Sequence, residues 1–194
     1  MTLNIIKIKS YISGIYPPQS LIPMSFYFFC KNKNIIRQDV DRWCECTNLP
    51  LKFSFYHALS YLLVFNKEFR NLYYRRLGII GKLISIIVPG IKTLFITSAP
   101  IGGGFFIRHG YSTFINTEKI GDNCTVHQNT TIGDNGRGIP RIGNNVIIGT
   151  GAIVLGPITI GDDVTIGAGA IVVDDVPSNS TVVGVKAHVI KNNN

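Results

Sequence analysis

The sequence has few charged residues and no long uninterrupted apolar segment. Charged residues make up 15% of the 194-residue chain against 45% hydrophobic residues, a balance that excludes an intrinsically disordered protein. The longest apolar stretch near the middle, residues 79–91, is interrupted by a Gly-Lys pair and a Pro-Gly pair, so it is too short to span a bilayer. Residues 1–14 contain no apolar run followed by a small-residue cleavage site, and we therefore expect no secretory signal.

Cysteines are also few, and their spacing fits neither a disulfide framework nor a zinc site. Cys44 and Cys46 form a C-x-C pair, but no second pair and no nearby histidine completes a zinc spacing. An even count of cysteines does not imply a disulfide framework in a chain of this length. We therefore expect free thiols, no bound metal and a cytoplasmic protein.

Acidic residues are scarce in the first half of the chain. Residues 1–92 hold 13 Lys and Arg against 4 Asp and Glu, a net charge of +9, whereas residues 93–194 hold 6 against 7, a net charge of −1. A basic, aromatic-rich half could contact nucleic acid or an anionic membrane surface. Because the basic residues form no run of five or six, a solvated helical surface explains them as well. We expect no nucleic-acid partner and retain a peripheral membrane contact as an alternative.

The first half carries helical periodicity, and we expect an α-helical N-terminal region over residues 1–94. Leucines and aromatics recur at helical spacing over residues 53–77, which predicts one long helix with Ser54 as its N-cap and Gly78 as its stop. Residues 79–88 predict a second, short amphipathic helix. Upstream, RQDVDRWCE predicts a short helical turn, and IYPPQSLIP, with three prolines, predicts a loop or an extended connector.

From Ile101 onward, apolar residues recur at every sixth position. The first position of each repeat is Ile or Val, the second is Gly in six of nine repeats, and the fifth is often small or β-branched. The nine hexads are IGGGFF (101–106), IRHGYS (107–112), IGDNCT (120–125), VHQNTT (126–131), IGNNVI (142–147), IGTGAI (148–153), VLGPIT (154–159), IGDDVT (160–165) and IGAGAI (166–171).

A period of six matches neither a strand, which repeats every two residues, nor a helix, which repeats every 3.6. It fits a short flat strand followed by a tight turn, in which the second-position Gly, or an Asn or Asp nearby, takes a turn conformation unfavourable to other residues. Three such units make one triangular coil, and stacked coils form a parallel β-helix. The stretch IGDNGRGIPR (132–141) replaces one hexad, so we expect it to contain a protruding loop.

These hexads, the closing segment DDVPSNSTVVGVKAHVI (174–190) and the helical N-terminal region resemble the left-handed β-helix, hexapeptide-repeat acyltransferases. Within that group, the chain resembles serine O-acetyltransferase and its relatives. The resemblance implies a mainly β fold, in which a left-handed parallel β-helix of residues 95–194 follows the α-helical region. It also implies homotrimers or dimers of trimers, active sites in clefts between neighbouring β-helices, and acetyl-CoA as co-substrate.

The same resemblance assigns the candidate catalytic residue. His109, inside GGGFFIRHGYS, takes the place of the histidine that removes the proton from the acceptor hydroxyl. An alcohol needs a positioned base whose own pKa lies near neutrality, and attack on a thioester needs donors for the developing oxyanion. Without the resemblance, His109 would be interpreted as a turn histidine with no role.

The remaining candidates are binding residues. His127, one coil further on, is either a substrate contact or an ordinary surface residue. Matching hexads place backbone contacts with CoA near Thr150 and Ala168, whereas Lys186 and Lys191 either meet CoA phosphates through charge or are solvated tail lysines.

Three departures from the serine acetyltransferases put the acceptor in question, and a fourth alters the closing segment. Arg108 stands where they carry an acidic residue directly before the catalytic histidine, and Gly138-Ile139 stand where they carry an Arg-His pair. Residues 92–102 lack the upstream Asp that would orient His109, and Lys186 stands where the family usually has Pro. Because Arg108 inverts the charge that suits the ammonium group of serine, it favours a neutral or anionic acceptor. We therefore treat Arg108 as a candidate substrate-binding residue.

Three alternatives to serine acetylation follow. The first is O-acetylation of a sugar in surface polysaccharide synthesis. The second is a metalloenzyme such as a β-helix carbonic anhydrase, which needs three histidine ligands, of which His109 and His127 could supply two. The third is a non-catalytic β-helix that serves only assembly.

Overall fold

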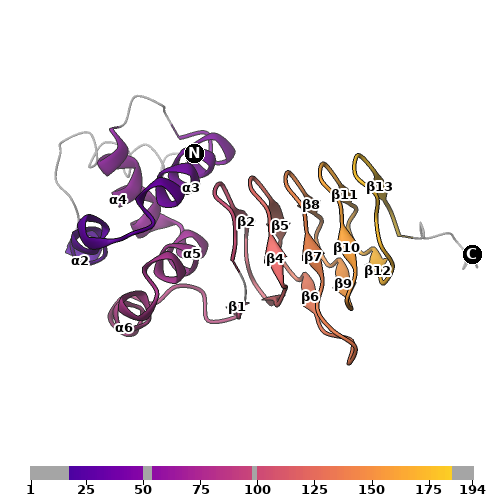
Figure 1. Ribbon diagram of the computed structural model, residues 1–194. Coiled ribbons are helices and arrows are strands. Elements are labelled where there is room, and N and C mark those ends of the chain that lie inside the picture. Colours follow the sequence, from indigo (N-terminus) through magenta and orange to yellow (C-terminus); the bar gives the residue numbers. More distant parts are fainter. Residues whose placement is uncertain (1–17, 50–53, 98–99, 185–194) are drawn as a thin grey trace, which may run out of the picture.

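The computed structural model describes residues 18–49, 54–97 and 100–184, and it joins a group of helices to a parallel β-helix (Figure 1). The coils extend from the helical end in chain order, so each coil contacts the one before it and the one after it (Figure 1). The mainly β fold class, a left-handed parallel β-helix after N-terminal helices, is confirmed. The helical elements are α2 (Pro18–Ser25), η1 (Phe26–Phe29), α3 (Lys33–Cys46), α4 (Phe55–Phe65), α5 (Lys67–Leu77) and α6 (Ile79–Ile87).

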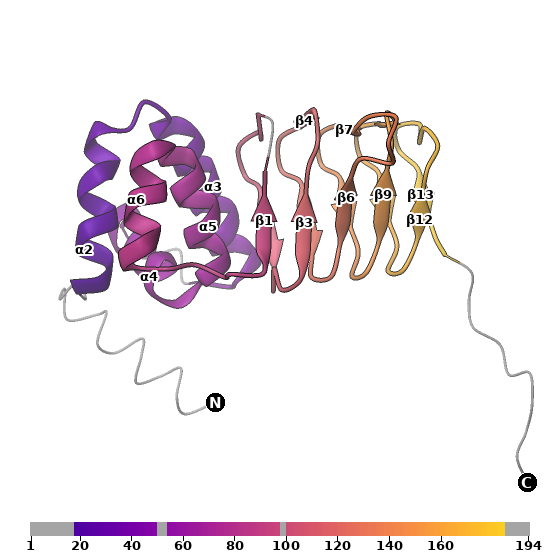
Figure 2. The ribbon, with the colours of Figure 1, turned by 90° about the horizontal axis from the view of Figure 1, so that it is seen from below.

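The coils build three parallel sheets, here named sheets A, B and C. Figure 2 shows the strands of sheet A side by side along the solenoid. Sheet A contains β1 (Leu94–Ile96), β3 (Thr113–Ile115), β6 (Thr131–Gly133), β9 (Ile153–Leu155) and β12 (Ile171–Val172). Sheet B contains β4 (Lys119–Ile120), β7 (Arg141–Ile142) and β10 (Thr159–Ile160). Sheet C contains β2 (Phe106–Arg108), β5 (Thr125–His127), β8 (Ile147–Ile148), β11 (Thr165–Ile166) and β13 (Thr181–Val182).

The hexad pattern describes the core of the β-helix correctly. Every first-position Ile or Val is at most 5% exposed, and the small or β-branched fifth-position residues are buried beside them. The predicted loop is also present between β6 and β7, where the Asp134 carboxylate accepts hydrogen bonds from the N–H groups of Gly136 and Gly138. It projects from the coils in Figure 1.

The second-position glycines of the hexads do not adopt the turn conformation that the sequence pattern suggested for them. Positive φ values occur at the fourth position, in eight of the nine hexads, at residues such as Asn123, Asn145 and Asp163. The second-position glycines instead lie against the next coil: a Cβ on Gly121 would come within 2.5 Å of the Gly143 carbonyl oxygen. The nearby Asn or Asp therefore makes the turn, and the glycine permits close stacking.

Three expectations for the helical region are wrong. The single long helix divides at Asn66, whose extended backbone (φ −112°, ψ 94°) ends α4 and begins α5. Tertiary packing overrides the helical pattern here, because α4 and α5 pack against each other and the Asn66 side chain makes no capping hydrogen bond. Part of the proline-rich stretch forms α2, with Pro23 inside the helix, and the expected short turn is the 14-residue α3. The helix at 79–88 and the stop at Gly78 (φ 64°) are confirmed.

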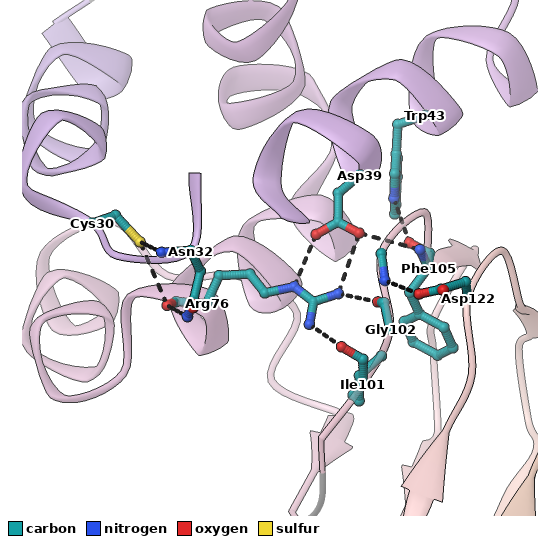
Figure 3. A network of polar contacts seen from close by, with 10 residues as sticks. Cys30, Asn32, Asp39, Trp43, Arg76, Ile101, Gly102, Phe105 and Asp122 are labelled. Carbon is teal, nitrogen blue, oxygen red and sulfur yellow. Dashed lines mark hydrogen bonds and ion pairs between the residues drawn. The ribbon is translucent and has the colours of Figure 1, made fainter. Parts of the chain in front are cut away.

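A buried ion pair fastens the helices to the first coil (Figure 3). The Arg76 side chain donates from Nε and Nη2 to the two carboxylate oxygens of Asp39, at 2.9 and 3.2 Å, and also donates to the carbonyls of Ile101 and Gly102. Trp43 Nε1 donates to the Phe105 carbonyl at 2.9 Å. Helices α3 and α5 therefore hold the start of β2 in a fixed position.

Within the residues that the structure describes, none of the helices combines the length and apolar character needed to cross a membrane.

Candidate active site

The turns that join sheet C to sheet A stack into one edge of the β-helix, here named the C–A edge. It consists of residues 109–112, 128–130, 149–152 and 167–170, and backbone hydrogen bonds connect each turn to the next. Asn129 N–H donates to the Tyr111 carbonyl at 2.9 Å, Gly151 N–H to the Gln128 carbonyl at 3.1 Å, and Gly169 N–H to the Thr150 carbonyl at 2.9 Å. The hexad period thus aligns chemically different turns in one column.

Five of the seven predicted site residues lie on this edge or at the strand ends beside it. His109, Thr150 and Ala168 belong to its turns, and Arg108 and His127 are the last residues of β2 and β5. The other two, Lys186 and Lys191, lie outside the described residues. The sequence pattern therefore places residues 59 positions apart in the chain along one line.

His109 begins the first turn of the C–A edge with an unusual backbone. Its φ is +63°, and apart from Ser112 in the same turn, every other non-glycine residue with positive φ in the described part of the chain is Asn or Asp. A left-handed conformation costs an L-residue with a Cβ on the order of 1–2 kcal/mol. His109 is exposed, and its carbonyl accepts a hydrogen bond from Tyr111 N–H. This backbone at an exposed histidine makes His109 a candidate functional residue.

Arg108 and His127 face each other across adjacent strands. They are register partners in the parallel pair of β2 and β5, and the Arg108 guanidinium lies 5.5 Å from the centre of the Phe106 ring. Partial burial lowers the pKa of His127, and the positive charges of Arg108 and His109 lower it further. The imidazole of His127 is therefore neutral near pH 7 and can accept a hydrogen bond.

The turns at Thr150 and Ala168 expose backbone rather than large side chains. Gly151 and Gly169 have positive φ values of 69° and 68°, and a Cβ at either position would meet no atom within 4 Å. Thr150 is half-buried and Ala168 is exposed. This part of the edge leaves room for a molecule that approaches the backbone closely.

Sequence reasoning missed the contribution of α5 to this region. A Cβ placed on Gly110 would lie 3.1 Å from Glu68 Cγ and 3.1 Å from Leu94 Cδ2, so the first turn of α5 packs beside the residue after His109. No hexad and no motif connects Glu68 with His109 in the sequence. The contact arises only when α5 packs on the first coil.

Comparisons with known proteins agree with this architecture. The family model Bacterial transferase hexapeptide (six repeats) matches residues 140–174. A serine acetyltransferase of Staphylococcus xylosus is 41% identical over 127 residues, which are 62% of this chain and 59% of the relative. A serine acetyltransferase of Synechococcus elongatus is 41% identical over 134 residues, which are 66% of this chain and 55% of the relative. The chain thus spans less than two thirds of the length of these relatives.

Solved structures give the same result. Serine acetyltransferase isoform 3 of Entamoeba histolytica, in complex with cysteine, superposes with a TM-score of 0.63 at 27% identity, over 83% of this chain and 60% of that one. Serine acetyltransferase of Brucella abortus strain S19 superposes with a TM-score of 0.63 at 26% identity, over 81% and 68% of the two chains. The predicted resemblance to hexapeptide-repeat acyltransferases of the serine acetyltransferase type is confirmed.

Proposed function

We propose that this chain is an acetyl-CoA-dependent O-acetyltransferase in which His109 is the general base. The observation that carries the proposal is the composition of the C–A edge: a strained, exposed histidine begins it, and turns with open backbone follow it on successive coils. The similarity to serine acetyltransferases along the matched part of the chain supports the same reaction class.

In the proposed reaction, the neutral His109 imidazole takes the proton from the acceptor hydroxyl as the hydroxyl oxygen attacks the thioester carbonyl. The tetrahedral intermediate collapses with cleavage of the carbon–sulfur bond, and the imidazolium returns its proton to the departing CoA thiolate. The products are the acetyl ester and CoA. General-base assistance of this kind contributes about 10²–10⁴-fold to the rate. Backbone N–H groups of the edge are the proposed donors to the oxyanion.

Acetyl-CoA is the proposed co-substrate, bound along the C–A edge. Thr150 and Ala168 are proposed to contact it through backbone groups, a role supported by the open space at Gly151 and Gly169. Lys186 and Lys191 remain proposed contacts for its phosphates. The division of the chain into a helical region of residues 1–94 and an acyltransferase domain of residues 95–194 also remains a proposal.

A homotrimer is the proposed working form, because one β-helix offers only one wall beside the C–A edge and a neighbouring copy would supply the second. Whether trimers pair into hexamers is a matter for measurement of the molar mass by light scattering. A reducing cytoplasm is the proposed location, supported by the free thiols of all four cysteines.

A peripheral contact with an anionic membrane surface is proposed for the helical end. Helix α6 exposes five aliphatic side chains in nine residues, with exposed fractions from 41% to 79%: Ile79, Ile80, Leu83, Ile86 and Ile87. Ile80 lines the same hollow as Phe29, which is 82% exposed, and Lys31. An apolar helix face with basic residues beside it, in a region of net charge +9, suits anionic lipid headgroups.

The acceptor is proposed to carry a hydroxyl group, with serine as the candidate that the relatives' names give. Arg108 favours instead an acceptor without an ammonium group, such as a sugar. The test is to mix the purified protein with acetyl-CoA and a panel of serine, free sugars and nucleotide sugars, and to follow the release of free thiol. Turnover with one member supports the proposal. The proposal fails if no acceptor is turned over and acetyl-CoA does not bind, as a non-catalytic assembly protein would behave.

A further inference from the structure

A basic pocket of about 640 Å³ lies next to the first turn of the C–A edge. Its walls are Gln19 of α2, the first half of α5, the end of α6 with the segment after it (residues 87–93), and Tyr111. Three of the residues that line it are cationic, namely Lys67, Arg70 and Lys92, and none of the described residues that line it is acidic. The pocket is distinct from the edge turns at Thr150 and Ala168, which lie two and three coils further along.

Arg70 is the unusual member of this pocket. Only 6% of it is exposed, yet none of the ion pairs among the described residues includes it, and its Nε has no hydrogen-bond partner. Burial lowers the pKa of its guanidinium, an effect that the nearby Tyr74 and Glu68 oppose. A buried donor without a partner is costly, and arginine donors in a pocket match the geometry of an oxyanion.

The pocket is preformed rather than a gap between mobile segments. Asn71 Nδ2 donates to the Ile91 carbonyl at 3.0 Å, and Ile91 N–H donates to Asn71 Oδ1 at 2.7 Å. Tyr74 Oη donates to the Val88 carbonyl at 2.8 Å, and a Cβ on Gly90 would come within 2.0 Å of Asn71 Oδ1. These contacts hold the segment against α5, so the backbone that carries Lys92 is already in place beside Arg70 before a ligand binds.

Two contacts connect the pocket with the catalytic turn. Tyr111 lines the pocket, and its N–H donates to the carbonyl of His109. Thr93 also lines it, and Thr93 Oγ1 accepts a hydrogen bond from Ser112 N–H at 3.3 Å. A ligand that fills the pocket therefore lies against the same four-residue turn that carries the proposed base.

We propose that this pocket binds a phosphate group of the acceptor and thereby places the acceptor hydroxyl beside His109. Three cations and no lining carboxylate match the charge of a phosphate dianion better than the single charge of a carboxylate or a neutral sugar. The substrate class is then a phosphorylated hydroxyl compound, such as a sugar phosphate. This inference rests on the proposed function. It specifies the chemical class of the acceptor, which Arg108 alone does not identify.

The first arm of the test measures binding without turnover. Inorganic phosphate is titrated into the full-length protein by isothermal calorimetry, with acetate as the carboxylate probe. We expect saturable phosphate binding, weakened about tenfold or more in Arg70→Met because a charge-assisted hydrogen bond is lost. Because Arg70 is buried, Arg70→Met also tests the stability of the fold. Lys67→Gln and Lys92→Gln change exposed side chains of the same pocket, so they test phosphate binding in proteins whose fold is unaffected. The control is Lys82→Gln, an exposed lysine on α6 that lines a different hollow.

The second arm distinguishes an acceptor phosphate from a CoA phosphate. We expect inorganic phosphate to compete with the acceptor and not with acetyl-CoA. We also expect kcat/KM to be about tenfold higher for a phosphorylated acceptor than for the same acceptor without its phosphate. Competition with acetyl-CoA alone, equal binding of acetate, or no difference between Lys92→Gln and Lys82→Gln would overturn the inference. If phosphate binds through Arg70 and Lys92 but no acceptor is turned over and acetyl-CoA does not bind, the proposed function fails, while the anion site itself is established.

Discussion

Arg108 and His127 are register partners at the ends of β2 and β5, and both take the second hexad position, which is Gly in six of the nine hexads. Partial burial lowers the pKa of His127, and the charge of Arg108 adds to this effect. The two side chains therefore form an electrostatically coupled pair, here named the Arg108–His127 unit, beside the first turns of the C–A edge. A change at Arg108 is therefore expected to alter the protonation of His127.

The first prediction concerns this unit. In Arg108→Gln, the pKa of His127 should rise toward its ordinary value, because the protonated imidazole no longer faces a like charge. Near pH 6 a larger fraction of His127 is then protonated than in the parent protein. The measurement is a titration of the imidazole resonances by NMR. Arg137→Gln, in the loop after β6, is the control and should leave the His127 titration unchanged; an unchanged titration in Arg108→Gln would contradict the assignment.

The second prediction concerns His109 as the base. Because its φ is +63°, a change to Ala removes both the imidazole and a residue type that tolerates this backbone. Asparagine tolerates it, so His109→Asn isolates the loss of the base. We expect kcat to fall about 10²–10⁴-fold in His109→Asn, with the affinity for acetyl-CoA retained. His57→Gln on α4 is the matched control, and turnover in His109→Asn equal to that of this control would exclude the mechanism.

The third prediction concerns the orientation of His109. Residues 92–102 supply no carboxylate, whereas Glu68 of α5 packs beside Gly110. We predict that Glu68 is a positioning residue, so Glu68→Gln should lower kcat about tenfold with little change in the KM of the acceptor. Glu68→Asp should restore part of the rate, which a purely steric role would not explain. Glu45→Gln on the exposed face of α3 is the control, and equal rates in Glu68→Gln and Glu45→Gln would refute the role.

The fourth prediction concerns the second-position glycines. In Gly121→Ala the new Cβ would come within 2.5 Å of the Gly143 carbonyl oxygen and 2.6 Å of its carbon, and backbone atoms of the next coil cannot move aside easily. We expect a loss of about 1–3 kcal/mol in the free energy of unfolding. Gly136→Ala in the loop, where a Cβ meets no atom within 4 Å, should cost less although its φ is +87°. Chemical denaturation of both variants gives the comparison.

The β-helix could be predicted from the sequence because its contacts repeat. Each hexad packs on the coil before and after it, so the first and fifth positions report burial directly, and the burial of Ile120 and Cys124 follows the pattern. The same period aligns His109 with Thr150 and Ala168 on one edge. Whether these residues perform the roles assigned to them stays a prediction.

The helical region and the basic pocket could not be predicted in the same way. They bring together residues with no periodic relation: Asp39 pairs with Arg76, and Arg70 and Lys92 line one pocket. The break at Asn66 depends on how α4 and α5 pack, and a helical pattern continues across it. Local periodicity reports the face that a segment buries, not the segment against which it is buried.

The last prediction concerns the apolar face that five exposed aliphatic side chains form on α6. Figure 2 shows α6 at the periphery of the helical group. If this face contacts anionic membranes, the parent protein should sediment with vesicles that contain phosphatidylserine and less with vesicles of phosphatidylcholine alone. Leu83→Glu and Ile86→Glu place charges on exposed positions, so they should abolish vesicle binding and leave the fold intact. Val173→Glu, at an exposed position after β12, is the control. If the α6 variants instead lower the molar mass of the assembly and vesicle binding is unchanged, the face is an interface between copies of the chain and the membrane proposal is wrong.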